Sequence, residues 1–348
     1  MRALQITRTS EEPVLNEVDD PKPGPGQVVI KVGAAGACHS DISILEMPRD
    51  ANPMRLPFTL GHESAGWVHE LGDGVKGLEI GQAVVVYGAW GCGVCGRCRS
   101  GVDNYCEDPA ATVSSGGLGA DGGMAEYLLV PDARHLVPLP EGLDPVAAAP
   151  LTDAGLTPYH AIKRSWPKLV PTSTAVVIGA GGLGHMAVQI LKATTAARIV
   201  VVDMKKEALE LAESLGADHT VEAGELAPFA IRELTGGKGA DVVLDFVGND
   251  ATLAMAAASL RPLGDLTIVG IAGGSLHYNF FTVPYELSVQ SVYWGTRAEL
   301  VEVLELAARG LLKAHTTTYP LDRATEAYRA LWDGTLTGRA VIIPNNAP

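Results

Sequence analysis

Two residues near the start of the chain, Cys38 and His62, carry side chains that zinc favours as ligands. They lie in the segment CHSDISILEMPRDANPMRLPFTLGHE, which ends at Glu63. Asp41 can hold the second ring nitrogen of His62, as carboxylates do behind many metal ligands, and Ser40 can carry a proton. A lone cysteine is usually a small buried apolar side chain. A zinc hypothesis therefore requires a third ligand and a hydride carrier elsewhere in the chain.

Four further cysteines follow in the run GCGVCGRCRSGVDNYC: Cys92, Cys95, Cys98 and Cys106. The spacing C-x2-C-x2-C-x7-C can fill all four positions of a tetrahedral zinc site, and such a closed site is structural because no position is left for substrate. An iron–sulfur cluster is the main rival, but the common ferredoxin run has a three-residue final gap. An odd total of five cysteines also favours metal ligation over disulfides.

Asp153 has two interpretations. It precedes AGLTPYHAI, where it can cap a helix, and spacing alone favours that interpretation. Cys38 and His62 still need a third partner, and this need favours Asp153 as the ligand. One thiolate and one carboxylate would offset the 2+ charge, and a three-ligand site leaves the fourth position for water or substrate.

The pattern from residue 173 is typical of a dinucleotide-binding unit. A β-branched strand, TAVVIG, leads through a G-x-G-x-x-G loop into an apolar helix, and the next strand, RIVVVD, ends at Asp203. The loop residues are Gly179, Gly181, Gly182, Leu183 and Gly184. The glycines permit a tight turn and close approach of a pyrophosphate to the helix N-terminus. Asp203 would bind the adenosine ribose hydroxyls and repel a 2′-phosphate, which predicts NAD as the cofactor.

The remaining elements support two domains. Residues 1–37 form short strands around the turn cluster PKPGPG, which predicts a small barrel or sandwich. After residue 203, helices and strands alternate, which predicts a doubly wound parallel sheet. Phe246, Val269 and Ile271 lie at strand C-terminal ends, where ligands bind in such sheets, and we expect them to line the nicotinamide.

The motif GHE-x-x-G, followed by five residues and Gly72, resembles the signature of the zinc-containing medium-chain alcohol dehydrogenases, and Cys-x-Ser-Asp looks like the same family. The resemblance spans residues 1 to about 345 and is closest in pattern to bacterial secondary alcohol dehydrogenases. It implies an α/β protein with a GroES-like β-barrel catalytic domain over residues 1–154, completed by 293–348. It also implies a doubly wound Rossmann NAD-binding domain over 155–292, with the active site between the two.

The resemblance also implies residue roles and two zinc ions per chain. Cys38, His62 and Asp153 would hold the catalytic zinc, since some secondary-alcohol members of the family have Asp at the third position. The four-cysteine run would hold the structural zinc. Glu63 resembles a family acid behind the metal and would be an alternate ligand, while Arg339 matches a family arginine that reaches the cofactor phosphates. A solvated surface charge is an equally good interpretation of Arg339.

The proton relay departs from the family pattern. Ser40 would accept the alcohol proton, but the histidine that many relatives have three residues later is Ser43 here. The relay would therefore end in water or use His39. The segments expected to face the active site contribute apolar residues to a substrate pocket: Met54, Leu118, Phe281 and Trp294. Core packing explains each of these four equally well.

We therefore expect reversible NAD-linked oxidation of secondary alcohols, including aryl alcohols or diols, to ketones. The alternatives are a primary alcohol or aldehyde dehydrogenase of the same family, a zinc-free quinone or enoyl reductase, and a non-catalytic binding protein on this fold. A net charge of −14 argues against a nucleic-acid partner. With no apolar signal core and no membrane span, we expect a cytoplasmic protein. The family implies a homodimer or homotetramer, with SVYWG as a candidate for extending the sheet between subunits.

Overall fold

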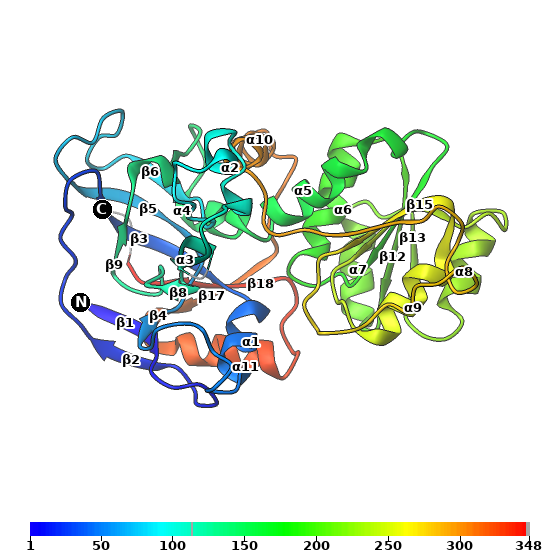
Figure 1. The fold of residues 1–348 in the computed structure, drawn as a ribbon, viewed down its shortest axis with the longest axis horizontal. Helices are drawn as coiled ribbons and strands as arrows, with labels where there is room; N and C mark the ends of the chain where they lie inside the picture. The colour runs from blue at the N-terminus through cyan, green and yellow to red at the C-terminus, as the bar shows by residue number, and fades with distance from the viewer. Residues whose placement is uncertain (113, 346–348) are drawn as a thin grey trace. The chain divides into compact units, whose positions relative to one another are not determined.

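The computed structural model describes residues 1–112 and 114–345, which form two compact units (Figure 1). Unit 1 comprises Met1–Asp153, Thr296–Arg309 and Ala314–Pro348, and unit 2 comprises Ala154–Gly295 and Gly310–Lys313. The chain thus leaves unit 1 after Asp153 and returns to it at Thr296, while residues 310–313 belong with unit 2.

Unit 1 is built on a seven-stranded sheet in the order β10-β6-β5-β3-β18-β17, with β9 also paired to β3. The strands are β3 Val28–Ala37, β5 Glu63–Leu71, β6 Ala83–Val86, β9 Tyr127–Val130, β10 Leu136–Pro138, β17 Thr316–Pro320 and β18 Arg339–Ile343. A smaller sheet has the order β2-β1-β4, with β1 Arg2–Ile6, β2 Val14–Glu17 and β4 Phe58–Thr59. Because β18 pairs with the long strand β3, the C-terminal segment is an integral part of this unit.

Two helices from opposite ends of the sequence pack together in unit 1. Helix α1 (His39–Glu46) and helix α11 (Ala324–Trp332) lie side by side (Figure 1). Ile42, Leu45 and Leu331 contribute to one buried apolar cluster with residues of both sheets. The other helices of this unit are α2 Gly96–Arg99, α3 Pro109–Thr112, α4 Pro145–Ala148 and α10 Arg297–Ala308. The packing of α1 against α11 brings the C-terminal segment close to the residues after Cys38.

Unit 2 is a six-stranded parallel sheet in the order β13-β12-β11-β14-β15-β16, which is the doubly wound order. The strands are β11 Thr174–Ile178, β12 Arg198–Asp203, β13 His219–Glu222, β14 Ala240–Asp245, β15 Leu260–Ile268 and β16 Ser288–Ser291. The helices are α5 Leu156–Arg164, α6 Gly184–Thr194, α7 Lys206–Ser214, α8 Ala227–Leu234 and α9 Asp250–Ser259. β11 is completely buried, as its β-branched sequence predicts.

One predicted element is displaced in the structure. The segment SVYWG, residues 291–295, is expected to be a strand, but β16 ends at its first residue, Ser291. The chain then leaves the sheet, and Trp294 has a positive φ of 51°, which is incompatible with an extended strand. Within the described part of the chain, every helix is too short or too polar to cross a membrane.

Candidate functional site

The structure brings Cys38, His62 and Asp153 together in unit 1. Cys38 is the residue before α1, His62 precedes β5, and Asp153 follows a 3-10 turn, Ala149–Thr152. The ligand atoms of the three residues lie within 4.8 Å of one another, and all three side chains are buried. Asp153 Oδ2 is 3.4 Å from His62 Nε2 and 3.9 Å from Cys38 Sγ. One sulfur, one imidazole nitrogen and one carboxylate oxygen therefore converge on a single point.

The helix-cap interpretation of Asp153 is wrong. Helix α5 begins at Leu156 with Gly155 in the N-cap position. The Asp153 carboxylate turns instead toward His62.

A buried carboxylate orients His62. Asp41 Oδ1 lies 3.1 Å from His62 Nδ1, and Asp41 is completely buried. With the ring proton on Nδ1 and donated to Asp41, Nε2 keeps a lone pair on the side of Cys38 and Asp153. Asp41 also accepts a hydrogen bond of 3.0 Å from the Cys38 backbone N–H, which caps α1. One carboxylate thus fixes the helix that begins beside Cys38 and the tautomer of His62.

This donor set suits a divalent cation. Burial by itself lowers the pKa of His62, but Asp41, Asp153 and Cys38 outweigh that effect and raise the pKa well above its usual range. The surrounding groups therefore attract positive charge at Nε2. Zinc fits the set, because thiolate, imidazole and carboxylate are its usual ligands and two anionic ligands match its charge.

Glu63 and Arg339 form a buried ion pair next to this site. Arg339 donates to both carboxylate oxygens of Glu63, at 2.9 and 2.6 Å, and its guanidinium lies 3.6 Å from Asp153 Oδ2. Both side chains are almost completely buried. A surface-charge role for Arg339 is therefore wrong, because the carboxylates hold the guanidinium inside unit 1. Its contact with cofactor phosphates and the alternate-ligand role of Glu63 stay predictions.

The predicted relay residues lie at the start of α1. Ser40 Oγ is 3.6 Å from Cys38 Sγ, and the Ser40 side chain is half-buried. His39 is exposed. Ser43 Oγ donates to the His39 backbone carbonyl at 3.1 Å, a local helix contact that gives Ser43 a structural use. The structure thus leaves Ser40 beside the ligand cysteine and His39 toward solvent.

The second group of ligands is the four cysteines of the lobe around α2, namely Cys92, Cys95, Cys98 and Cys106. Their sulfur atoms lie within 4.8 Å of one another. Backbone N–H groups point at the sulfurs, including Cys98 N to Cys95 Sγ at 3.4 Å and Cys92 N to Cys106 Sγ at 3.3 Å. The hydrogen bond from the Glu107 backbone, followed by that from Cys98, lowers the pKa of Cys95 to about 6. Four convergent sulfurs with amide donors match a tetrahedral structural zinc site.

The glycine loop of unit 2 has the geometry of a phosphate cradle. Gly179 has φ of 85°, and a Cβ on Gly184 would lie 1.8 Å from the Gly179 carbonyl oxygen. A Cβ on Gly181 would meet nothing within 4 Å, so open space borders the backbone just before α6 begins. Two glycines are thus required by the fold of the loop. The third leaves room for a ligand at the helix N-terminus.

Asp203 ends β12 beside this loop. Its carboxylate accepts 2.7 Å and 2.9 Å hydrogen bonds from the backbone N–H groups of Ala180 and Lys205. These bonds hold a half-buried carboxylate at the strand end where the adenosine ribose of a dinucleotide lies in this fold. A turn-residue role accounts for the Lys205 contact, but the Ala180 contact ties Asp203 to the glycine loop itself.

The residues predicted to contact the nicotinamide or the substrate range from buried to fully exposed. Phe246 and Val269 are half-buried just after β14 and β15, and Ile271 is exposed. Met54 and Leu118 pack partly buried against the apolar cluster of unit 1. Trp294 is 4% exposed, whereas Phe281 is 91% exposed. Their roles toward cofactor and substrate stay predictions.

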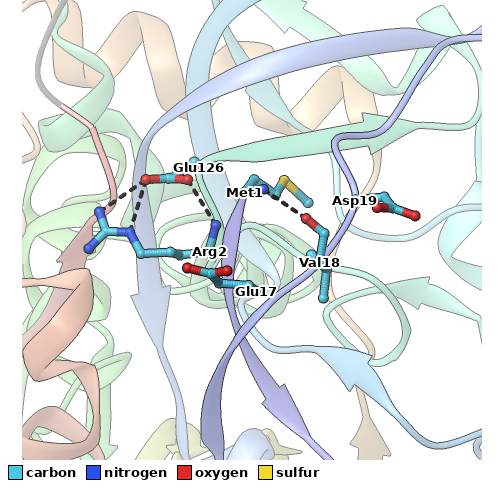
Figure 2. A pocket seen from close by; sticks show the side chains of 6 residues that line it. All are labelled: Met1, Arg2, Glu17, Val18, Asp19 and Glu126. Atoms are coloured by element: carbon cyan, nitrogen blue, oxygen red, sulfur yellow. Dashed lines mark hydrogen bonds and ion pairs between the residues drawn. The ribbon is translucent and has the colours of Figure 1, made fainter.

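A surface hollow in unit 1 is separate from these ligands (Figure 2). It is lined by Met1, Arg2, Glu17, Val18, Asp19 and Glu126. The Met1 ammonium donates to the Val18 carbonyl, and Arg2 pairs with Glu126 (Figure 2). The two cationic groups of the hollow are paired internally, and its lining has no histidine or cysteine, so the metal centres are the stronger candidates for the functional site.

Tyr328 contacts this site although the sequence around it does not indicate such a role. Its hydroxyl donates to Asp41 Oδ2 at 2.9 Å, although the two residues are 287 positions apart. The only sequence signal is a tyrosine on the apolar face of the helical segment over residues 324–332, and that pattern equally fits core packing.

Known proteins resemble this chain over its whole length. Residues 24–141 match the family model of the alcohol dehydrogenase GroES-like domain, and residues 182–309 match that of the zinc-binding dehydrogenases. An NAD-dependent alcohol dehydrogenase of Saccharolobus solfataricus is 38% identical, and the match covers 99% of this chain and 100% of the relative.

Solved structures of alcohol dehydrogenases and related enzymes are also similar to this chain over nearly its whole length. The alcohol dehydrogenase of Aeropyrum pernix has a TM-score of 0.92 at 36% identity, covering 99% of this chain and 100% of that chain. Acetophenone reductase from Geotrichum candidum, solved in complex with NAD, has a TM-score of 0.85 at 32% identity, and the match covers 98% of this chain and 96% of that chain. These matches confirm the predicted α/β architecture, with a GroES-like domain and a Rossmann-type parallel sheet.

Proposed function

Because the chain belongs to the zinc-containing medium-chain alcohol dehydrogenase family, we propose that it is a zinc-dependent, NAD-linked enzyme that interconverts secondary alcohols and ketones. The observation that carries this proposal is the convergence of Cys38, His62 and Asp153 on one point in unit 1. Three protein ligands leave a zinc ion one open position, as catalytic zinc sites require.

The ligand residues prepare this site for an alcohol oxygen. Zinc on Cys38 Sγ, His62 Nε2 and an Asp153 oxygen would polarise that oxygen and lower the pKa of the hydroxyl. Asp41 keeps the proton of His62 on Nδ1, so Nε2 is available as a ligand. Cys38 and Asp153 would supply two negative charges to offset the 2+ charge of the metal, and both side chains are buried.

Ser40 Oγ is the proposed acceptor of the alcohol proton. It lies beside Cys38 Sγ and is half-buried. The relay then ends in water or at His39, which is exposed on the same helix turn.

We propose NAD as the hydride acceptor. NAD carries the redox chemistry, and the protein supplies binding and orientation. The open space at Gly181 suits the pyrophosphate, and Asp203 suits an unphosphorylated ribose. Contacts of Phe246, Val269, Ile271 and Arg339 with this cofactor are part of the same proposal.

Two features support secondary alcohols over primary alcohols. The third ligand is Asp153, which the family pattern associates with secondary-alcohol enzymes, and one relative is an acetophenone reductase, whose named substrate is a ketone. Met54, Leu118, Phe281 and Trp294 are proposed to contribute apolar pocket walls, which would suit aryl substrates.

The test is an absorbance screen for NADH formation with matched primary and secondary alcohols. We expect secondary alcohols to give higher kcat/KM, and Cys38→Ser to abolish turnover. A preference for primary alcohols with intact zinc would select the primary alcohol or aldehyde dehydrogenase alternative. Full activity without bound metal would select the zinc-free reductase alternative and refute the proposal.

We further propose a homodimer or homotetramer formed through the edge of the unit 2 sheet. β16 pairs with β15 on one side only, and an unpaired edge is a template for another strand. The neighbouring loop exposes Phe280 and Tyr285, aromatic side chains of the kind expected at a subunit interface. Sedimentation analysis tests this, and a monomer at micromolar concentration would exclude it.

We propose that the protein is cytoplasmic, because its thiol ligands favour a reducing compartment.

A further inference from the structure

We propose that Tyr328 is a positioning residue for the metal site: it holds Asp41 in place, and Asp41 in turn holds His62. The inference rests on the proposed function, because it assigns a role in forming the Cys38–His62–Asp153 site. It adds a residue from the C-terminal helix α11 to a site whose ligands all come from the first 153 residues.

Both oxygens of the Asp41 carboxylate face polar partners. Oδ1 faces His62 Nδ1, whereas Oδ2 accepts the Cys38 backbone N–H at 3.0 Å and the Tyr328 hydroxyl at 2.9 Å. Asp41 is completely buried. A buried carboxylate needs such donors, and charge-assisted hydrogen bonds are the strong ones.

The Tyr328 hydroxyl donates its proton to Asp41. The hydroxyl also lies 3.0 Å from Met124 Sδ, but a thioether is a weak acceptor and the single proton goes to the carboxylate. Burial, followed by the charge of Asp41, raises the pKa of Tyr328 well above its usual range. The hydroxyl therefore remains a donor.

Packing around Tyr328 holds its side chain in a fixed position. Tyr328 is 3% exposed, and Ala327 and Leu331 on the same helix are buried in the cluster that includes Ile42 and Leu45 of α1. Packing thus fixes the hydroxyl position relative to α1. Without it, Oδ2 would keep only the Cys38 amide, and the Asp41 carboxylate could rotate away from His62.

The test compares wild type with Tyr328→Phe, which removes one oxygen and keeps the ring in the core. Zinc affinity is measured by competition with a chromophoric chelator on the full-length protein. The site is identified as the zinc that is lost in Cys38→Ser. We expect about tenfold weaker zinc binding at this site, within the range for partners behind metal ligands. We also expect an altered visible spectrum after cobalt substitution, because that spectrum reports ligand geometry.

Tyr319→Phe is the matched control. Tyr319 is partly buried against the same apolar cluster but lies on β17. We expect this variant to keep wild-type zinc affinity and cobalt spectrum. An equal change in both variants would mean that the hydroxyl acts only through core packing, and would overturn the proposal.

A double-variant cycle with Asp41→Asn separates positioning from general stability. If Tyr328 acts through Asp41, Tyr328→Phe should change zinc affinity much less in the Asp41→Asn background. A full tenfold effect in that background, or wild-type affinity and spectrum for Tyr328→Phe alone, would overturn the inference while leaving the proposed function intact. Wild-type protein without zinc at the Cys38 site would overturn both.

Discussion

Ser40 is proposed to accept the alcohol proton and Asp203 to bind the adenosine ribose, and small substitutions test both roles. Ser40→Ala should lower the rate of alcohol oxidation by about 10²–10⁴-fold, the contribution of a positioned proton acceptor. Zinc content and NAD affinity should remain near wild type, because Ser40 is not among the ligand atoms. Single-turnover kinetics provides the measurement. An unchanged hydride-transfer rate would remove Ser40 from the relay.

Asp203 should control the choice between NAD and NADP. Its carboxylate is held beside the glycine loop by the amides of Ala180 and Lys205, where it would meet a 2′-phosphate with like charge. Asp203→Ser should shift the ratio of kcat/KM values toward NADP by about 10–10³-fold, which corresponds to about 1–4 kcal/mol. Steady-state kinetics with both cofactors measures the shift. Equal use of both by wild type, unchanged in the variant, would make Asp203 a turn residue.

At the scale of elements, two glycines of the loop before α6 should have different roles: Gly184 in folding and Gly181 in cofactor binding. Gly184→Ala places a Cβ 1.8 Å from the Gly179 carbonyl oxygen, so Tm should fall. Gly181→Ala meets no protein atom within 4 Å, so Tm should change little while NAD binding weakens. Thermal melts and NAD titrations measure the two effects. If Gly181→Ala bound NAD normally, the open space would not be the pyrophosphate site.

The four-cysteine lobe around α2 should stabilise the folded protein and should have little part in catalysis. Cys95→Ser opens a closed site whose binding energy contributes to folding. Tm should therefore fall, while kcat of the remaining folded protein stays close to wild type, because the lobe ligands are a separate group from Cys38, His62 and Asp153. Ser40→Ala serves as a control with the opposite pattern. A normal melting curve with lost turnover would reverse the roles assigned to the two metal sites.

At the scale of the whole molecule, two complete ligand groups predict two zinc ions per chain. Elemental analysis of metal-replete protein should find about two, and Cys38→Ser should retain about one. The reason is that the two groups share no residue and each converges within 4.8 Å. Wild-type protein lacking metal at both sites would contradict the assignment.

Features that are local along the chain were predictable from the sequence alone. The C-x2-C-x2-C spacing, the G-x-G-x-x-G loop between a strand and a helix, and the acid at the end of the next strand each lie within a short segment, so spacing and periodicity are sufficient. The alternation of strands and helices similarly predicted the parallel sheet of unit 2.

The contacts of residues whose partners are remote in sequence became visible only in the folded structure. Asp153 turns toward His62 instead of capping α5, Arg339 pairs with Glu63 at a separation of 276 residues, and Tyr328 reaches Asp41 from α11. No local pattern encodes these contacts. The Arg339 and Tyr328 contacts exist because β18 pairs with β3 and α11 packs on α1, and the Asp153 contact exists because the turn Ala149–Thr152 packs against β5. Those pairings are formed by burial of apolar surface over the whole unit.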